Sequence, residues 1–251
     1  CRLSRLGRAA SVAGVRSFWG SGSVTAFSGS FVAVPACGVV KMFAYALVAL
    51  VFLYSRSYRI RAGLFKGEFF ILGLFGLLGV MVMISANSLL TLYLGLEILS
   101  LSLYTLVAFD RESATATEAA MKYFVLGAIA SGTLLYGLSI LYGVAGTVQL
   151  DELAAHFSAP DALNVPALLG LAFIIVGVAF KFGAVPFHMW LPDVYEGAPA
   201  PVPLFIATAP KIAAFALMWR LLADGLGGLT VSWQPRSRVL LVPAFGKVEV
   251  F

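Results

Sequence analysis

The feature that most constrains the fold is a series of long runs without a charged side chain. Residues 123–150 contain no Asp, Glu, Lys or Arg over 28 positions, and residues 69–96 are also free of charge. A bilayer core about 30 Å thick needs roughly 20 helical residues to cross it. Only 12% of the chain is charged, against roughly 25% in ordinary globular proteins. We therefore expect an all-α, multi-pass transmembrane helix bundle, and we exclude a soluble domain and a disordered chain.

The charge-free runs predict six spans. Residues 69–96 break at the polar turn 85–88, which gives spans at about 69–86 and 88–109. The other four are expected at 31–55 with Lys41 inside, 123–150, 162–192 with Lys181 inside, and 197–219 with Lys211 inside.

The charges in the loops predict the orientation. The loop Ser55–Gly67 carries four basic residues and no acid before Glu68, so it is expected on the cytoplasmic or matrix side. Alternation of the spans then places residues 110–118 and 193–196 on that side. It places the acidic loop 151–166 on the opposite side.

The two ends differ in composition from the apolar middle. Residues 1–30 hold four arginines among Ser and Gly without an acid, which is typical of a transit peptide, with a cloning scar or a misread frame as alternatives. Residues 234–251 are too short and proline-broken to span. We divide the chain into a basic segment 1–30, a first span with its loop 31–68, a membrane domain 69–222 and a tail 223–251.

Four ionisable residues lie within the apolar spans, where each costs about 2.5–3.5 kcal/mol at the bilayer centre. They are Glu97, Lys122, Lys181 and Lys211. Glu97 is near the middle of its span, and Tyr93, Ser100 and Tyr104 share its helical face. This polar stripe predicts a proton or ion site facing the bundle interior. A polar clasp between helices is the alternative.

Lys181 and Lys211 each lie beside a helix breaker. Pro186 has no N–H for the carbonyl of Phe182, and Pro210 has none for that of Ile206. Free carbonyls at membrane depth are tolerated only where protein or water satisfies them. Charge beside a broken helix is typical of a transport site. Two kinked helices with incidental lysines are the alternative.

Lys122 and His188 are weaker candidates. Lys122 is near the end of its span, where a lysine often extends to the interface. Gly127 and Ser131 on the same helix allow a close helix contact, and this contact could bring Lys122 toward Glu97. His188 follows Pro186 closely and could relay protons because imidazole ionises near neutral pH. A hydrogen-bonded packing histidine is the alternative.

The chemistry of a buried lysine suits proton transfer. Burial disfavours the charged ammonium form and a nearby carboxylate favours it. Movement of an acid toward or away from a lysine therefore changes whether the lysine holds its proton. This mechanism requires no metal and no nucleotide.

Common motifs for binding nucleotides, redox cofactors or metals are absent from the sequence. It contains no GxGxxG, no Walker loop, no CxxC and no HExxH, and its cysteines are Cys1 and Cys37 alone. We expect no cofactor or metal in this chain and no nucleic-acid partner.

Several segments resemble the antiporter-like membrane subunits of respiratory Complex I. They are NSLLTLYLGLEILSL at 87–101, AMKYF at 120–124, KFGAVPFHMWLPDVYEGAP at 181–199 and ATAPKIA at 207–213. The resemblance covers about residues 69–222. It implies inverted five-helix repeats, each with one discontinuous helix, and it implies that this chain holds the first repeat and lacks the second.

The resemblance also implies roles and partners. Glu97 and Lys181 would form an acid–lysine couple, Lys211 would pass protons on, and Lys122 would occupy a further lysine position. NADH, flavin, iron–sulfur clusters and quinone would belong to other subunits of the complex. The partners would be its other membrane subunits and the lipid bilayer, in the bacterial inner (plasma) membrane or, alternatively, the mitochondrial inner membrane.

Two other functions remain open at this point. The chain could belong to a multi-subunit cation/proton antiporter, whose membrane subunits look alike. It could also be a structural membrane module in which the charges only fix helix packing.

Overall fold

A computed structural model describes residues 24–159 and 164–227. The first 23 residues, which form most of the expected basic segment, and the tail 234–251 lie outside the described residues. Within these described residues, six helices are long and apolar enough to cross a membrane, which confirms the expected number of spans. They are α2 (Pro35–Arg61), α3 (Gly67–Ser85), α4 (Leu89–Val107), α5 (Ala114–Ala145), α7 (Val165–Phe182) and α9 (Pro201–Met218), the last continued by the π-helical turn η1 (Trp219–Gly225).

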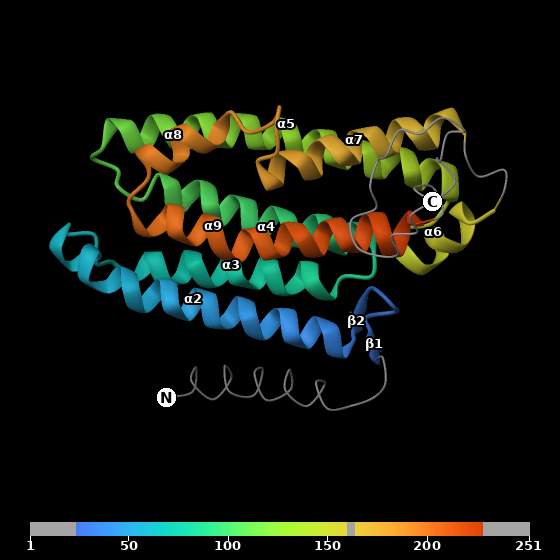
Figure 1. Ribbon diagram of the computed structural model, residues 1–251, viewed down its shortest axis with the longest axis horizontal. Helices are drawn as coiled ribbons and strands as arrows, with labels where there is room; N and C mark the ends of the chain where they lie inside the picture. The colour runs from blue at the N-terminus through green and yellow to red at the C-terminus, as the bar shows by residue number, and fades with distance from the viewer. Residues whose placement is uncertain (1–23, 160–163, 228–251) are drawn as a thin grey trace, which may run out of the picture.

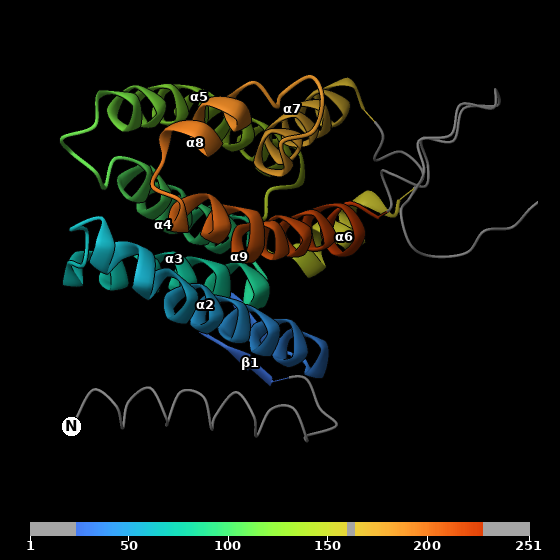
Figure 2. The ribbon, with the colours of Figure 1, turned by 60° about the vertical axis from the view of Figure 1, so that its left-hand side comes forward.

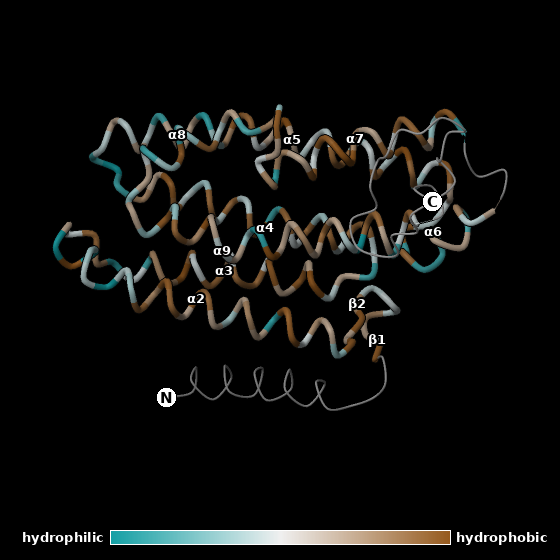
Figure 3. Tube along the Cα trace, in the orientation of Figure 1, coloured by the Kyte–Doolittle hydropathy of each residue, from teal (hydrophilic) through white to brown (hydrophobic). Residues whose placement is uncertain are grey.

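The long helices lie in three layers (Figures 1 and 2). One layer contains α2 and α3, the middle one contains α4 and α9, and the third contains α5, α7 and the short helix α8 (Trp190–Gly197). Apolar residues dominate along the helices, and hydrophilic segments gather at their ends and connections (Figure 3). This distribution is the one that a bilayer requires.

The connections occupy two ends of the bundle, as the alternation of spans predicts. Residues 62–66, 108–113 and 198–200 lie at one end, on the left of Figure 1. Arg111 of the second connection approaches Glu68 at the start of α3, with 3.9 Å between Nη2 and Oε2. The short helix α6 (Leu150–Phe157) lies at the opposite end.

The start of the first span differs from the prediction. Residues 31–33 form strand β2 (Phe31–Ala33), which pairs antiparallel with β1 (Val24–Ala26), so the fold is mostly rather than purely helical. Helix α2 begins at Pro35, because proline is favoured in the first helical turn, and it runs through Lys41 without a break. A backbone hydrogen bond from Asn87 to Ser30 joins the hairpin to the turn between α3 and α4.

Helix α5 begins earlier than predicted, at Ala114 instead of 123. The Ser113 side chain accepts a hydrogen bond from the backbone N–H of Ala116 at 3.2 Å and so caps the helix. Gly146 ends α5 with a left-handed φ of 72°. At 32 residues the helix is longer than a bilayer core, so Lys122 lies in its third turn rather than at its start.

The predicted break near Lys181 is confirmed, whereas the one near Lys211 is wrong. Helix α7 ends at Phe182, where Gly183 has a left-handed φ of 69°, and α8 begins only at Trp190. Helix α9, by contrast, continues through Pro210 without interruption. A single proline removes one N–H, whereas the Gly183–Pro186 segment adds a residue that readily reverses the chain.

Candidate functional site

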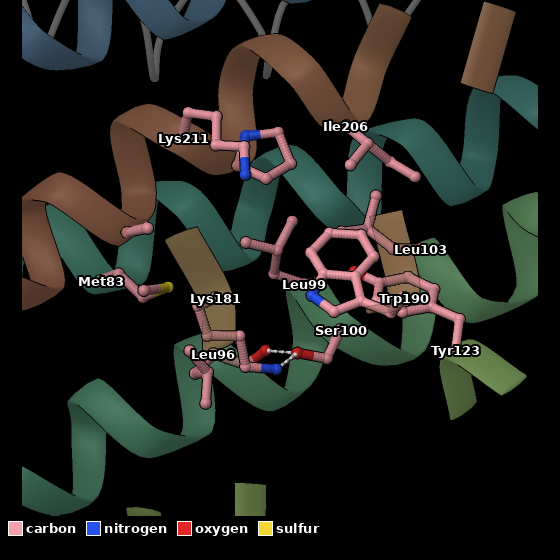
Figure 4. Close-up of a pocket in the computed structure, with 12 residues that line it drawn as sticks. Met83, Leu96, Leu99, Ser100, Leu103, Tyr123, Lys181, Trp190, Ile206 and Lys211 are labelled. Atoms are coloured by element: carbon pink, nitrogen blue, oxygen red, sulfur yellow. Dashed lines mark hydrogen bonds between the residues drawn. The ribbon is translucent and has the colours of Figure 1, made fainter. Parts of the chain in front are cut away.

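The centre of the candidate site is Lys181, in the last turn of α7. Its Nζ atom donates a hydrogen bond to Ser100 Oγ of α4 at 2.8 Å (Figure 4) and a longer one to Ser131 Oγ of α5 at 3.5 Å. Both serines are buried. The ammonium group is therefore held by two neutral hydroxyls from two other helices, and no carboxylate of the described chain lies within 4.0 Å of it.

Glu97 lies one helical turn from Ser100 on the same face of α4, an axial distance of about 4.5 Å. Its Oε1 atom is buried and has no hydrogen-bond partner. A buried carboxylate oxygen without a donor is costly. The structure shows no direct Glu97–Lys181 contact, so the acid–lysine couple remains a prediction.

The polar stripe on α4 faces the bundle interior, as its spacing predicts. Tyr104 packs edge-on against Tyr123 of α5, with 4.8 Å between ring centroids. Gly127 of α5 lies directly against the Tyr104 ring: a β-carbon there would be 2.7 Å from Cζ. The small residues Gly127 and Ser131 thus allow the close contact of α4 and α5 that their spacing predicts.

Lys211, in the middle of α9, fills the gap left by the broken helix. Its Nζ donates a 2.7 Å hydrogen bond to the carbonyl oxygen of Phe182, the carbonyl that Pro186 leaves without its helical donor. The residue that accepts this bond immediately follows Lys181. Lys211 is therefore hydrogen-bonded to the backbone of the residue that follows Lys181 at the end of α7.

Trp190 holds the break from the other side, and the sequence interpretation missed it. The side chain is 2% exposed. Its Nε1–H donates to the carbonyl of Phe180 at 3.1 Å, and its ring stacks on Tyr123 with 4.6 Å between centroids. Lys211 Nζ lies 5.6 Å from the indole centroid, within the range of a cation–π contact.

A small cavity lies between the two lysines. Lys181, Ser100 and Lys211 contribute polar atoms to its lining, and Trp190 and Tyr123 contribute ring faces (Figure 4). Its volume of about 20 Å³ is roughly enough for one water molecule. A water there would have the polar partners that a buried water requires.

Lys122 makes its ion pairs with residues outside this cluster. Its Nζ pairs with Glu118 of the same helix at 2.9 Å and with Asp193 of α8 at 3.3 Å, and its side chain is 44% exposed. The ion-pair partners of Lys122 are thus Glu118 and Asp193 rather than Glu97, and its approach toward Glu97 stays a prediction.

His188 lies in the turn between α7 and α8, and it is exposed. Its backbone carbonyl accepts a hydrogen bond from Leu191. Its imidazole does not reach Lys181 or Lys211 by any hydrogen bond in the described part of the chain. A relay role for His188 remains a prediction. Within residues 24–159 and 164–227, no group of three His, Cys, Asp or Glu is placed to hold a metal.

The sequence also matches a model of a membrane-protein family, described as NADH:quinone oxidoreductase/Mrp antiporter, TM, over residues 86–236. Subunit N of the NADH-quinone oxidoreductase of Thioalkalivibrio sulfidiphilus is 57% identical over 217 residues. That match covers 86% of this chain and 45% of the relative, so the chain spans about half the length of that relative.

Solved structures share the fold. A chain of respiratory complex I from Thermus thermophilus, solved with bound aureothin, is 33% identical to this chain, with a TM-score of 0.68. The match covers 85% of this chain and 45% of that one. A chain of the Mrp complex from Dietzia sp. DQ12-45-1b has a TM-score of 0.71 at 24% identity, over 90% of this chain and 44% of its own. The second likeness shows the fold alone.

Proposed function

The chain belongs to the NADH:quinone oxidoreductase/Mrp antiporter transmembrane family, and on this premise we propose that it is the proton-translocating part of a membrane subunit of NADH:quinone oxidoreductase. The 57% identity to a subunit N supports this reading over other members of the family. In this role the chain is a subunit of an enzyme complex and carries no redox centre itself.

One observation carries the proposal: an intramembrane lysine of α9 hydrogen-bonds the backbone at the end of the broken helix α7, next in sequence to a second intramembrane lysine. Lys211 donates to the Phe182 carbonyl at 2.7 Å, and Lys181 is the preceding residue. Both lysines have only neutral hydrogen-bond acceptors among the described residues. A buried ammonium that no carboxylate contacts directly is poised to release its proton when its surroundings change.

The proton moves in two transfers. Protonated Glu97 gives its proton to the neutral amine of Lys181, which leaves a carboxylate and an ammonium. Rotation of the Glu97 side chain or a bridging water brings the carboxyl proton within reach of the Lys181 amine. The Lys181 ammonium then gives a proton to the neutral amine of Lys211 through the water-sized cavity.

Lys122 and His188 have secondary roles in this proposal. Lys122 and its carboxylate partners lie near the end that carries the basic loop, where they collect protons for Glu97. His188 is exposed beside the break and relays protons to or from the remainder of the protein. Neither residue contacts the central lysines.

The energy source and the cofactors lie elsewhere in the complex. NADH, flavin, iron–sulfur clusters and quinone belong to other subunits, and the other membrane subunits are the partners of this one. The chain is a multi-pass protein of the bacterial inner membrane, and its basic loop 55–67 faces the cytoplasm.

The proposal is tested in the complete subunit, assembled in its complex. Glu97→Ala and Lys181→Ala are expected to lower the number of protons pumped per NADH oxidised, measured in membrane vesicles with a pH-sensitive dye. An unchanged ratio in both variants rejects the role.

Two controls separate the alternatives. Sodium-dependent exchange without NADH oxidation would instead assign the chain to a cation/proton antiporter, the class of the Dietzia complex whose fold it shares. In a double-mutant cycle on Glu97 and Lys181, coupling that alters assembly but not proton flux would assign it a structural role.

A further inference from the structure

A groove on the surface of the bundle lies apart from the lysine site. It runs between the last turns of α2, from Leu53 to Arg61, and the beginning of α9 at Ala200, Pro201 and Leu204. Its volume is about 550 Å³, which is typical of a pocket for a small molecule. None of its lining residues takes part in the proposed proton path.

The groove has a polar stripe supplied by one helix. Tyr54, Ser57, Tyr58 and Arg61 follow the spacing i, i+3, i+4 and i+7, so they lie on one face of α2. Arg61 Nε donates to the Ser57 carbonyl at 3.3 Å, so the arginine side chain lies back along this stripe. Its two terminal nitrogens make no ion pair with the acids of the described chain.

The groove is also amphipathic along its length. Leu53 lies two helical turns before the end of α2 and Leu204 lies one turn inside α9, so both are farther from the helix ends than Arg61. Arg61 is the last residue of α2. Helix ends that carry tyrosine and arginine are typical of the level of the lipid headgroups. The groove therefore places apolar walls toward the acyl chains and hydrogen-bond donors toward the headgroups.

The surrounding charge is positive. Arg59 is 1% exposed and lies between the rings of Phe69 and Phe70, 4.3 and 4.2 Å from their centroids, and no acid pairs with it among the described residues. The nearby Glu68 is directed to Arg111 instead. Arg59 does not line the groove, so the cation that the groove itself offers to an anion is the guanidinium of Arg61.

From this geometry we infer that the groove binds an anionic membrane phospholipid. The phosphate accepts hydrogen bonds from the Arg61 guanidinium and the hydroxyls of Ser57 and Tyr58, and an acyl chain lies along Leu53 and Leu204. A phospholipid fits better than a soluble anion, because only an amphipathic ligand uses both the donors and the apolar walls. Basic pockets between transmembrane helices are known to bind such headgroups.

The test compares two arginines in the complete subunit within its complex. Arg61→Gln removes the cation of the groove, and Arg56→Gln makes the same charge change on the same helix at an exposed position outside it. After reconstitution in nanodiscs that contain equal amounts of phosphatidylglycerol and phosphatidylcholine, native mass spectrometry counts the retained lipids. We expect Arg61→Gln to lower phosphatidylglycerol retention about tenfold and Arg56→Gln to leave it unchanged.

A second variant tests the groove by shape alone. Ala200→Trp places a large ring in the groove without changing the charge, and it is expected to lower phosphatidylglycerol retention as Arg61→Gln does. Equal loss in both arginine variants, unchanged retention in Ala200→Trp, or equal retention of phosphatidylcholine would each overturn the inference. So would a photo-reactive amino acid at position 58 that cross-links to polypeptide rather than to lipid.

Discussion

The hydroxyl of Ser100 offers a sharp test of how Lys181 holds its proton. Ser100→Ala removes the 2.8 Å acceptor from the Lys181 ammonium and leaves only Ser131 at 3.5 Å. A hydrogen bond to a charged group is worth about 1.5–3 kcal/mol. Because Ser131 remains, we expect the lower end of this range, which corresponds to a shift of about tenfold in the equilibrium between protonated and neutral Lys181.

Ser102 supplies the matched control on the same helix. Ser100 and Ser102 are both buried, and each donates a 2.7 Å hydrogen bond to the carbonyl four residues earlier. Their alanine variants thus lose the same hydroxyl group and the same local hydrogen bond, but only Ser100→Ala also loses a contact with Lys181.

The assay is the initial rate of NADH-driven proton uptake by vesicles that contain the complete subunit in its complex. It is normalised to NADH oxidation and to assembled complex on native gels. Ser100→Ala is expected to lower the normalised rate, by at most about tenfold, whereas Ser102→Ala leaves it near the wild-type value. Equal rates in the two variants would refute the idea that Ser100 stabilises the proton-bearing lysine.

Two further predictions concern the packing around the site. Trp190→Phe keeps the stacked rings but removes the hydrogen bond to the Phe180 carbonyl. Because that carbonyl also accepts a hydrogen bond from a backbone N–H, we expect the free energy of unfolding to fall by only about 1 kcal/mol. Thermal unfolding in detergent measures this loss. Gly127→Ala places a β-carbon against the Tyr104 ring and should cost about 1–3 kcal/mol, whereas Gly132→Ala on the same helix, with no atom within 4 Å, should not destabilise. Similar melting temperatures for the two glycine variants would contradict the close packing of α4 and α5.

The spans and the broken helix could be predicted because they depend on local chemistry. Charge-free runs mark the membrane helices wherever they fold, and the turn at Ser85–Ser88 and the break after Gly183 follow from the residues at those positions. The free carbonyl of Phe182 could also be predicted from Pro186. Its partner could not, because Lys211 comes from a helix that only tertiary packing brings to that point.

The remaining features depend on contacts between distant segments. The Trp190–Tyr123 stack and the Lys122–Asp193 pair both require α8 to fold back onto α5, and no spacing within either helix indicates this. Residues 31–33, the second strand of the hairpin, read as the start of an apolar span, because short strands and helices cannot be separated by hydrophobicity alone. At Pro210 the sequence predicts a break that the structure does not contain, because this proline is accommodated in a continuous helix.

The central claim is that Lys181 and Lys211 form one proton path. The direct measurement is the number of protons pumped per NADH oxidised by complexes whose complete subunit carries Lys181→Met, Lys211→Met or both. If the two lysines act in series, each single variant lowers the ratio by the same amount and the double variant lowers it no further. Losses that add, or a ratio that stays at the wild-type value in either single variant, would contradict the account.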